Sequence, residues 1–280
     1  PLSIDQFLDR EGPGWHALQG DEQRDTARGL TLRLGREMAQ RINSAVVINP
    51  INLVAMAIVP SPRHALDERG LVQQIEWLQA IASRLPYSPH AMLTAVDPPA
   101  AIALALKLGF ATRVAHPLGD IIMVPDKQVS TLNYLRNNVL HAYAWPALVA
   151  NLLVALREVT PERVAEFAEG GLPFLRAELM LHHSPGEAIA ESGRVVQLFL
   201  EMGLARSSQD GKLRAADRYS PEHAGLELLA RSLRHLLRRN YLTIALVTGV
   251  GSGKLKRERL EELMQMLTQR LSLLFEFAPP

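Results

Sequence analysis

The chain has 280 residues, of which 48% are hydrophobic and 21% charged, and its formal net charge is +1. This balance is typical of a globular protein and gives no reason to expect a polyanion as partner. Because the sequence has no cysteine, disulfide bonds and thiolate metal sites are excluded. The length suffices for one large or two ordinary domains, and the first residues lack the basic and apolar regions of a signal peptide.

Apolar periodicity predicts a mainly helical chain. Leu30, Leu34, Met38 and Ile42 recur at every fourth position, which indicates an amphipathic helix that ends near Asn43. Further helix starts are marked by a capping residue followed by proline, because the cap accepts from a free backbone N–H and proline has none to satisfy. Pairs of this kind, each predicted to begin a helix, are Asn49-Pro50, Ser61-Pro62, Ser88-Pro89, Thr160-Pro161, Ser184-Pro185 and Ser220-Pro221.

The stretch from Asn137 to Leu156 contains no Asp, Glu, Lys or Arg. An uncharged run of this length is either the central helix of a large core or a membrane segment. Pro146 and Asn151 interrupt its apolar character, and the mean hydropathy of the whole chain is only +0.02. We therefore predict a single buried central helix rather than one that spans a membrane.

Two segments are predicted to break the helical pattern with β-hairpins. In each, a leucine-rich helix ends at a glycine, Gly109 or Gly203, and short β-prone pieces follow around a turn. The expected hairpins cover residues 112–124 and 205–215, and the second contains the turn pair Asp210-Gly211.

The two hairpin segments also resemble each other. A shift of 94 residues places Leu104 on Leu198 and Gly109 on Gly203, which predicts an internal repeat of about 95 residues. The expected organisation is a helical lead-in over residues 1–49, a unit over 50–144, a second unit over 145–240 and an incomplete third over 241–280. We thus predict a mainly α fold with small β-hairpins, built from repeated winged-helix-like units. Since the chain lacks an initial Met and stops within a unit, we expect a fragment of a longer protein.

Two short motifs resemble ligand sites but lack an essential part. Residues 248–255 resemble a phosphate-binding loop, yet Thr248 and Leu255 stand where that loop needs a glycine and a hydroxyl. We therefore predict a linker between helices. His182-His183 resembles a pair of metal ligands, but adjacent side chains diverge and no thiolate is present, so we predict a solvated loop at a helix end.

His16 and Asp21 have the His-x4-Asp spacing of a general-base pair. They stand in a polar Gly/Pro loop with no basic block after them, and we predict that the spacing is a coincidence. One later helix has a basic face made by Arg231, Arg234, His235, Arg238 and Arg239. We expect this face to be solvated or paired with carboxylates, with contact to anionic lipid or nucleic acid as the alternative.

The block Tyr134-Leu-Arg-Asn-Asn-Val-Leu-His141, preceded by Gly119-Asp-Ile-Ile-Met-Val-Pro125, resembles the C-terminal half of the bacterial membrane-bound glycerol-3-phosphate acyltransferases. The Tyr-x-Arg-Asn-Asn part is the specific signature. Supporting matches in the family's order extend the resemblance over nearly the whole chain: Pro1-Leu2, Arg41-Ile42-Asn43, Leu85-Pro86-Tyr87-Ser88, Pro146-Ala147-Leu148 and Ala177-Glu178-Leu179.

The resemblance implies a parent enzyme that transfers an acyl group from an acyl carrier protein or coenzyme A thioester to glycerol 3-phosphate, in phospholipid synthesis. The family's catalytic His-x4-Asp and phosphate-binding blocks lie upstream of this region, and His16 and Asp21 fall where the family has no motif. We therefore expect no catalytic residue, metal or cofactor here. The expected role is an accessory region that braces the acyltransferase domain, peripheral at the cytoplasmic face of the inner membrane, with acyl carrier protein and anionic lipid as further candidate partners.

A winged-helix module that binds nucleic acid or another protein is the alternative function. The helices that would enter a DNA groove carry few cations, because Lys107 is the one basic residue between Leu104 and Gly109, and Arg194 is offset by Glu201. We therefore expect no nucleic-acid partner.

Arg136, Asn137, Asn138 and His141 form the candidate interface or structural network of the family block. On a helix, Asn137 and His141 share one face, whereas Arg136 lies about 100° away from Asn137. We expect Arg136 to point away from that face toward carbonyl groups or a carboxylate, since its planar fork can satisfy several acceptors. A structural network inside the chain is favoured over a docking point for another domain.

Overall fold

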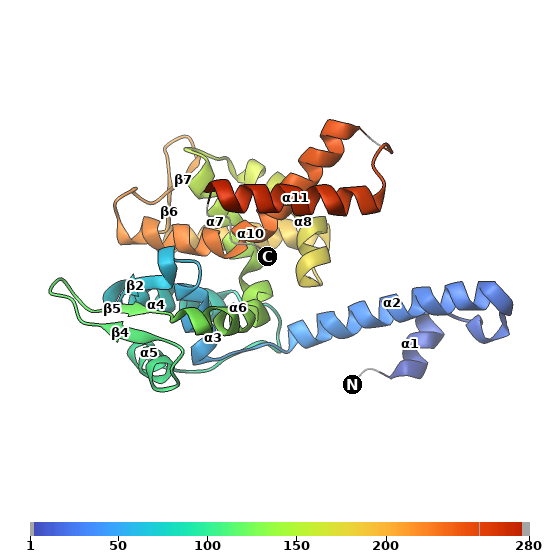
Figure 1. The fold of residues 1–280 in the computed structure, drawn as a ribbon, viewed down its shortest axis with the longest axis horizontal. Helices are drawn as coiled ribbons and strands as arrows, with labels where there is room; N and C mark the ends of the chain where they lie inside the picture. The colour runs from blue at the N-terminus through green and yellow to red at the C-terminus, as the bar shows by residue number, and fades with distance from the viewer. Residues whose placement is uncertain (1–2, 252, 276–280) are drawn as a thin grey trace.

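The computed structural model describes residues 3–251 and 253–275. The prediction of a mainly helical fold with small β-hairpins is confirmed: helices build most of the molecule, and the strands form one three-stranded and two two-stranded sheets. Figure 1 shows a helical body from which a two-helix arm at the N-terminal end projects.

The arm consists of α1 (Ile4–Glu11), the short 3-10 helix η1 (Trp15–Ala17) and α2 (Gly20–Ser44). The predicted helix over Leu30 to Asn43 is confirmed and begins earlier than its apolar period indicated. Phe7 of α1 and Leu30 of α2 are the buried residues that join the two helices. We call α1, η1 and α2 together the arm.

The first half of the body is organised around α3 (Pro50–Ile58), which is buried along its whole length because nearly every side chain in it is apolar. Helices α4, α5 and α6 pack on α3 or on each other. The remaining bounds of this half are β1 (Val47–Ile48), η2 (Pro62–His64), β2 (Ala65–Asp67), α4 (Glu68–Arg84), β3 (Met92–Leu93), α5 (Pro98–Lys107), β4 (Thr112–Val114), β5 (Ile121–Met123), α6 (Asp126–Leu140) and η3 (His141–Tyr143).

The second half is organised around α7 (Ala144–Ala155), which packs against α8, α9 and α10. Its other elements are α8 (Pro161–Leu179), α9 (Pro185–Glu201), β6 (Ala205–Ser207), β7 (Leu213–Ala215), α10 (Pro221–Val250) and α11 (Arg257–Phe275). The core residues of the two halves form one continuous apolar cluster. The expected boundary between residues 240 and 241 lies inside the continuous helix α10, and the division into units stays a prediction.

The apolar run is buried, as predicted, but it is not one helix. Helix α6 ends at Leu140, the 3-10 turn His141–Tyr143 follows, and α7 begins at Ala144. Pro146 explains the restart, since a residue without an N–H is tolerated in the first turn of a helix but not within one. By length and composition the segment Asp126–Ala155 could cross a membrane, yet 72% of its most apolar window is buried inside the fold.

Of the six predicted helix caps, four are confirmed and two are wrong. The side chains of Asn49, Thr160, Ser184 and Ser220 each accept from a backbone N–H at the start of a helix. The two exceptions are Ser61-Pro62, which opens the 3-10 turn η2, and Ser88-Pro89, which lies in a turn. Both of these hydroxyls donate instead to a carbonyl of an earlier helix, Ser61 to Ile58 and Ser88 to Ser44, so α4 and α5 begin later, after Asp67 and Asp97.

Both predicted hairpins are confirmed. β4 pairs antiparallel with β5, and β6 with β7. The glycines before them, Gly109 and Gly203, both adopt a φ of +72°, a left-handed conformation that an L side chain strains. The first hairpin gains a third strand that the pattern did not indicate, because β2 pairs with β5 from a distant position in the chain.

Candidate functional site

Five aromatic and histidine rings from separate segments meet near the base of the arm, and we call them the ring cluster. Tyr87 follows α4, His141 lies in η3, Trp145 lies in α7, and His182 and His183 connect α8 to α9. Tyr87 lies 4.8 Å from both His141 and His182 and 5.5 Å from His183, measured between ring centroids. His183 stacks on His182 at 4.2 Å and contacts Trp145 edge-on at 5.6 Å. The cluster thus links both halves of the body.

Burial keeps the cluster uncharged. His141 and His183 are each 4% exposed, and removal of the imidazolium from water lowers the pKa of both side chains to about 4. The same burial raises the pKa of the Tyr87 hydroxyl to about 12. At neutral pH the two histidines are therefore neutral rings that pack, rather than cations.

Hydrogen bonds near the cluster fix the end of α2. The Nε2 atom of His141 donates to the Asn43 carbonyl at 3.1 Å, which requires that this nitrogen carry the proton of the neutral ring. The Asn43 amide in turn donates to the carbonyl of Leu179 at 2.8 Å, and the Gln40 amide donates to the carbonyl of Leu181 at 3.0 Å. The base of the arm is consequently tied to the segment around α8.

The polar surroundings of the cluster contain few charged contacts. Across residues 3–251 and 253–275, no carboxylate forms a hydrogen bond or ion pair with His141, His182 or His183. In that part of the chain no group of three or more His, Asp or Glu residues could hold a metal ion either. The polar contact described for His141 is with the backbone carbonyl of Asn43, and Glu187 acts on His182 and His183 electrostatically.

The structure separates the four residues of the candidate network. His141 enters the ring cluster, whereas Asn137 and Asn138 are exposed. Arg136 is only 7% exposed, and its Nε and Nη2 donate to the Asn137 side-chain oxygen at 3.3 and 3.0 Å. The expectation that Arg136 points away from Asn137 is wrong, because its long side chain folds back to the nearest strong acceptor. Burial lowers the pKa of the guanidinium to about 10, so it remains charged at neutral pH.

Sequence reasoning missed other members of the cluster and misplaced one. His183 is buried, not solvated: Leu181, two residues before it, inserts into the core, and His183 is buried with it while His182 between them is exposed. Tyr87 and Trp145 were not predicted to take part. Tyr87 stood in a supporting block of the family resemblance and Trp145 in the apolar run, but neither signal shows that the rings meet in space.

The remaining motifs carry no site in the described structure. His16 contacts the ring of Trp15 in a tilted arrangement, with 4.2 Å between ring centroids. Asp21 is 95% exposed at its side chain and pairs with Arg24 at 3.4 Å rather than with His16. The glycine-rich residues 248–255 begin within α10 and lead toward α11, which confirms a link between helices for the described part.

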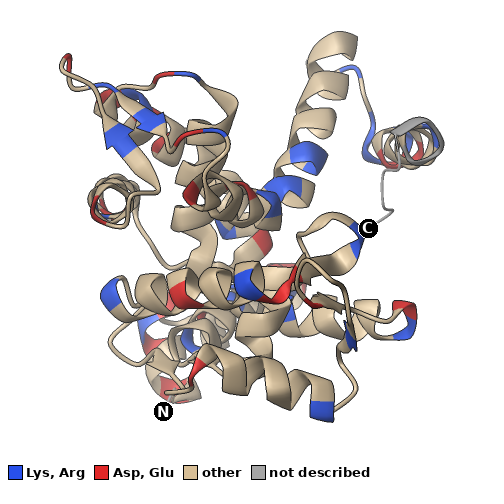
Figure 2. Cartoon of the chain, turned by 90° about the vertical axis from the view of Figure 1, so that its left-hand side faces the viewer, with Lys and Arg blue, Asp and Glu red and all other residues tan. Residues whose placement is uncertain are grey.

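The predicted pairing of the basic face on α10 is confirmed for two of its arginines. Arg231 pairs with Glu227 at 2.6 Å, and Arg239 pairs with Glu178. Over most of the ribbon in Figure 2, Lys and Arg are interspersed with Asp and Glu.

The fold and the ring cluster define a mainly helical region with a group of aromatic and histidine rings near the base of its arm. A family model for the glycerol-3-phosphate acyltransferase C-terminal region matches residues 1–280. The chain therefore belongs to the family of glycerol-3-phosphate acyltransferase C-terminal regions, as the resemblance of its sequence predicted.

Curated relatives agree with this assignment. The chain is 36% identical to the glycerol-3-phosphate acyltransferase of Pseudomonas aeruginosa strain UCBPP-PA14, and 33% and 34% identical to those of Pseudomonas fluorescens strain Pf0-1 and Pseudomonas putida strain GB-1. Each match covers 100% of this chain but 34% of the relative. The chain thus spans about a third of the length of these relatives.

Proposed function

We propose that this chain is the C-terminal accessory region of a glycerol-3-phosphate 1-O-acyltransferase and that it braces the catalytic domain. The observation that carries the proposal is the match of the whole chain to a third of each relative. A role in support rather than in chemistry agrees with the geometry, since His16 and Asp21 do not meet and the buried histidines lack a carboxylate partner in the described residues.

We also propose that the body consists of two repeated winged-helix-like units. In each half an apolar helix is followed by two more helices, a hairpin and a closing helix. The helices before the hairpins end alike: the amides of Leu108 and Met202 donate to the carbonyls of Leu104 and Leu198, and φ and ψ of both donors agree within 1°. Because these contacts are 94 residues apart, as the sequence shift requires, they support a duplication.

The central and closing helices of the two halves are joined by contacts of the same kind. In the first half the Asn52 amide of α3 donates to the carbonyl of Leu135 in α6 at 2.9 Å. In the second half the Asn151 amide of α7 donates to the carbonyl of Ala230 in α10 at 2.6 Å. The two acceptors are 95 residues apart in sequence, whereas the two donors are 99 apart, so the two contacts are alike in kind but their donors are not related by the repeat shift. In both units a side-chain amide of the central helix thus holds the closing helix against the central helix. The bond also gives each amide the hydrogen-bond partner that a poorly exposed polar group needs.

Acyl carrier protein and anionic lipid remain proposed partners of the full enzyme, at the cytoplasmic face of the inner membrane. The described structure does not favour nucleic acid, because charges of both signs are interspersed. A duplex-DNA gel shift at low salt is expected to show no tight, salt-sensitive complex.

The bracing role is tested with the Pseudomonas aeruginosa relative. We expect deletion of its C-terminal third to abolish most acyl transfer to glycerol 3-phosphate, and replacement of that third by this chain to restore it. An unrelated helical domain of similar length is the control and should not restore activity. Full activity of the deleted enzyme would contradict the bracing role. If the isolated chain transferred acyl groups at a rate above background, the proposal that the catalytic residues lie in the upstream portion would be wrong.

A further inference from the structure

The arm carries an apolar stripe that the described fold leaves uncovered. Leu32, Met38 and Ile42 of α2 are 67%, 49% and 70% exposed, and Gly35 and Ala39 lie between them. At 100° per residue these five positions fall within roughly a third of the helix circumference. We call them the outer stripe. Large apolar side chains gathered on one face of a projecting helix are the usual mark of an interaction surface.

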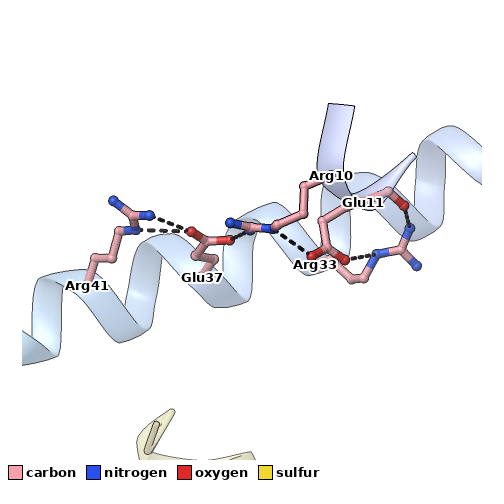
Figure 3. A network of polar contacts seen from close by, with 5 residues as sticks. All are labelled: Arg10, Glu11, Arg33, Glu37 and Arg41. Atoms are coloured by element: carbon pink, nitrogen blue, oxygen red, sulfur yellow. Dashed lines mark hydrogen bonds and ion pairs between the residues drawn. The ribbon is translucent and has the colours of Figure 1, made fainter. Parts of the chain in front are cut away.

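The stripe is not the face that holds α1. Figure 3 shows the polar network of that other face, in which Arg10 and Glu11 of α1 meet three residues of α2. Arg10 and Arg41 both pair with Glu37, and Arg33 pairs with Glu11 at 3.5 Å. Glu37 is five positions from both Leu32 and Ile42, which places it about 140° around the helix from each. The side of α2 away from α1 is therefore the one left without a partner.

The base of the arm is fixed, so the stripe is held in one place. Gln40 and Asn43 donate to the carbonyls of Leu181 and Leu179, and His141 donates to the Asn43 carbonyl. From this base the 25 residues of α2 extend about 37 Å, and Figure 1 shows them directed away from the body.

We propose that the outer stripe of α2 is the docking surface for the acyltransferase portion that forms the remainder of the full-length relatives. This inference rests on the proposed function and adds the surface through which bracing occurs. The remainder is about two-thirds of each relative, and the match to a C-terminal region places it before the arm, so the arm is the element nearest to it.

The chemistry of the stripe favours a helix or apolar groove of that portion as its occupant. A Cβ built on Gly35 would meet no atom within 4 Å, so a backbone can approach closely between Leu32 and Ile42. Close approach at small residues between larger apolar ones is typical of helix packing.

The test supplies the full-length enzyme as two separately expressed proteins, this chain and the acyltransferase portion. Titration calorimetry measures how tightly the two bind each other. We expect Leu32→Glu combined with Ile42→Glu to weaken binding at least tenfold. Gly35→Leu should weaken it similarly, and this change cannot act by unfolding the arm, because leucine favours helix more than glycine does. Leu118→Glu is the control: Leu118 is 93% exposed in the first hairpin, and its replacement should leave affinity unchanged.

The outcomes separate the two proposals. No binding by the unaltered chain would contradict the bracing role itself and the inference with it. Binding that survives both stripe variants would overturn the stripe alone. Two further outcomes would also overturn the stripe as the docking surface, provided that the stripe variants still form the two-part complex. If these variants abolish self-association of the chain in sedimentation, the stripe binds a second copy. If they abolish binding to anionic vesicles, the stripe binds a lipid surface.

Discussion

Neutral histidines in the ring cluster make stability depend on pH. His141 and His183 have a pKa of about 4 in the folded chain, against about 6.5 when unfolded. Between these values the unfolded chain binds protons that the folded chain does not. The stabilisation is therefore complete above pH 6.5 and is lost as the pH falls toward 4. A shift of this size corresponds to about 3 kcal/mol for each histidine as an upper bound.

We predict that the free energy of unfolding in urea falls between pH 7.5 and pH 5. In His141→Gln the fall should be shallower, because glutamine can still donate to the Asn43 carbonyl but does not titrate in this range. His90→Gln, at an exposed position, is the control and should keep the slope of the unaltered chain. If the unfolding free energy fell equally steeply with pH in all three chains, the buried ring of His141 would not be the source of the pH dependence.

At the scale of elements, the contact between α4 and α10 depends on a glycine. Gly225 is buried in α10, and a Cβ at this position would collide with the ring of Trp77 from α4. The nearby amide of Gln74 donates to the Gly225 carbonyl at 3.4 Å. The two helices can therefore approach this closely only without a side chain at position 225.

We predict that Gly225→Ala destabilises the fold by about 1–3 kcal/mol, the usual cost of overpacking a well-filled core. Gly193 of α9 is the matched control: a Cβ there meets no atom within 4 Å, so Gly193→Ala should stabilise by roughly 0.5–1 kcal/mol through helix propensity. Thermal melts of both variants check the prediction. A neutral result at Gly225 would mean that Trp77 moves aside without cost.

On the scale of the whole molecule, burial is unevenly distributed between body and arm. The central helices α3 and α7 are buried along nearly their full length, whereas α2 has one buried residue in 25. Local opening of a helix costs little where few apolar contacts are lost. The arm should therefore open without the body.

We predict that backbone amides of α3 and α7 exchange with deuterium slowest, near the rate set by global unfolding, and that the arm before residue 36 exchanges orders of magnitude faster. Hydrogen-exchange mass spectrometry of the chain measures this difference. Addition of the acyltransferase portion should slow exchange in α2 in particular if the outer stripe is the docking surface. If the backbone amides of arm and body were equally protected from exchange, unequal burial would not be the factor that controls local opening.

Local signals account for most of the secondary structure that was predicted correctly. The caps at Asn49, Thr160, Ser184 and Ser220 and the glycine stops at Gly109 and Gly203 depend on neighbours within a few residues, so they are visible in the sequence. The predicted helix starts at Ser61 and Ser88 were wrong because both hydroxyls donate hydrogen bonds to earlier carbonyl groups instead of capping a following helix. The Ser88 hydroxyl donates to a carbonyl 44 residues away, which no local pattern shows, and the Ser61 hydroxyl donates to the Ile58 carbonyl at the end of the helix before it.

By itself the sequence determined the helical class, the hairpins and the family, because these follow from periodicity, turn chemistry and a specific block of residues. The tertiary structure alone decided that Tyr87, His141 and His183 share one buried cluster, that Arg136 turns back onto Asn137, and that α2 projects with an uncovered stripe. The physical reason is distance along the chain. Contacts between residues tens of positions apart form only once the apolar helices have packed, and that packing sets which rings meet and which face of a helix stays open.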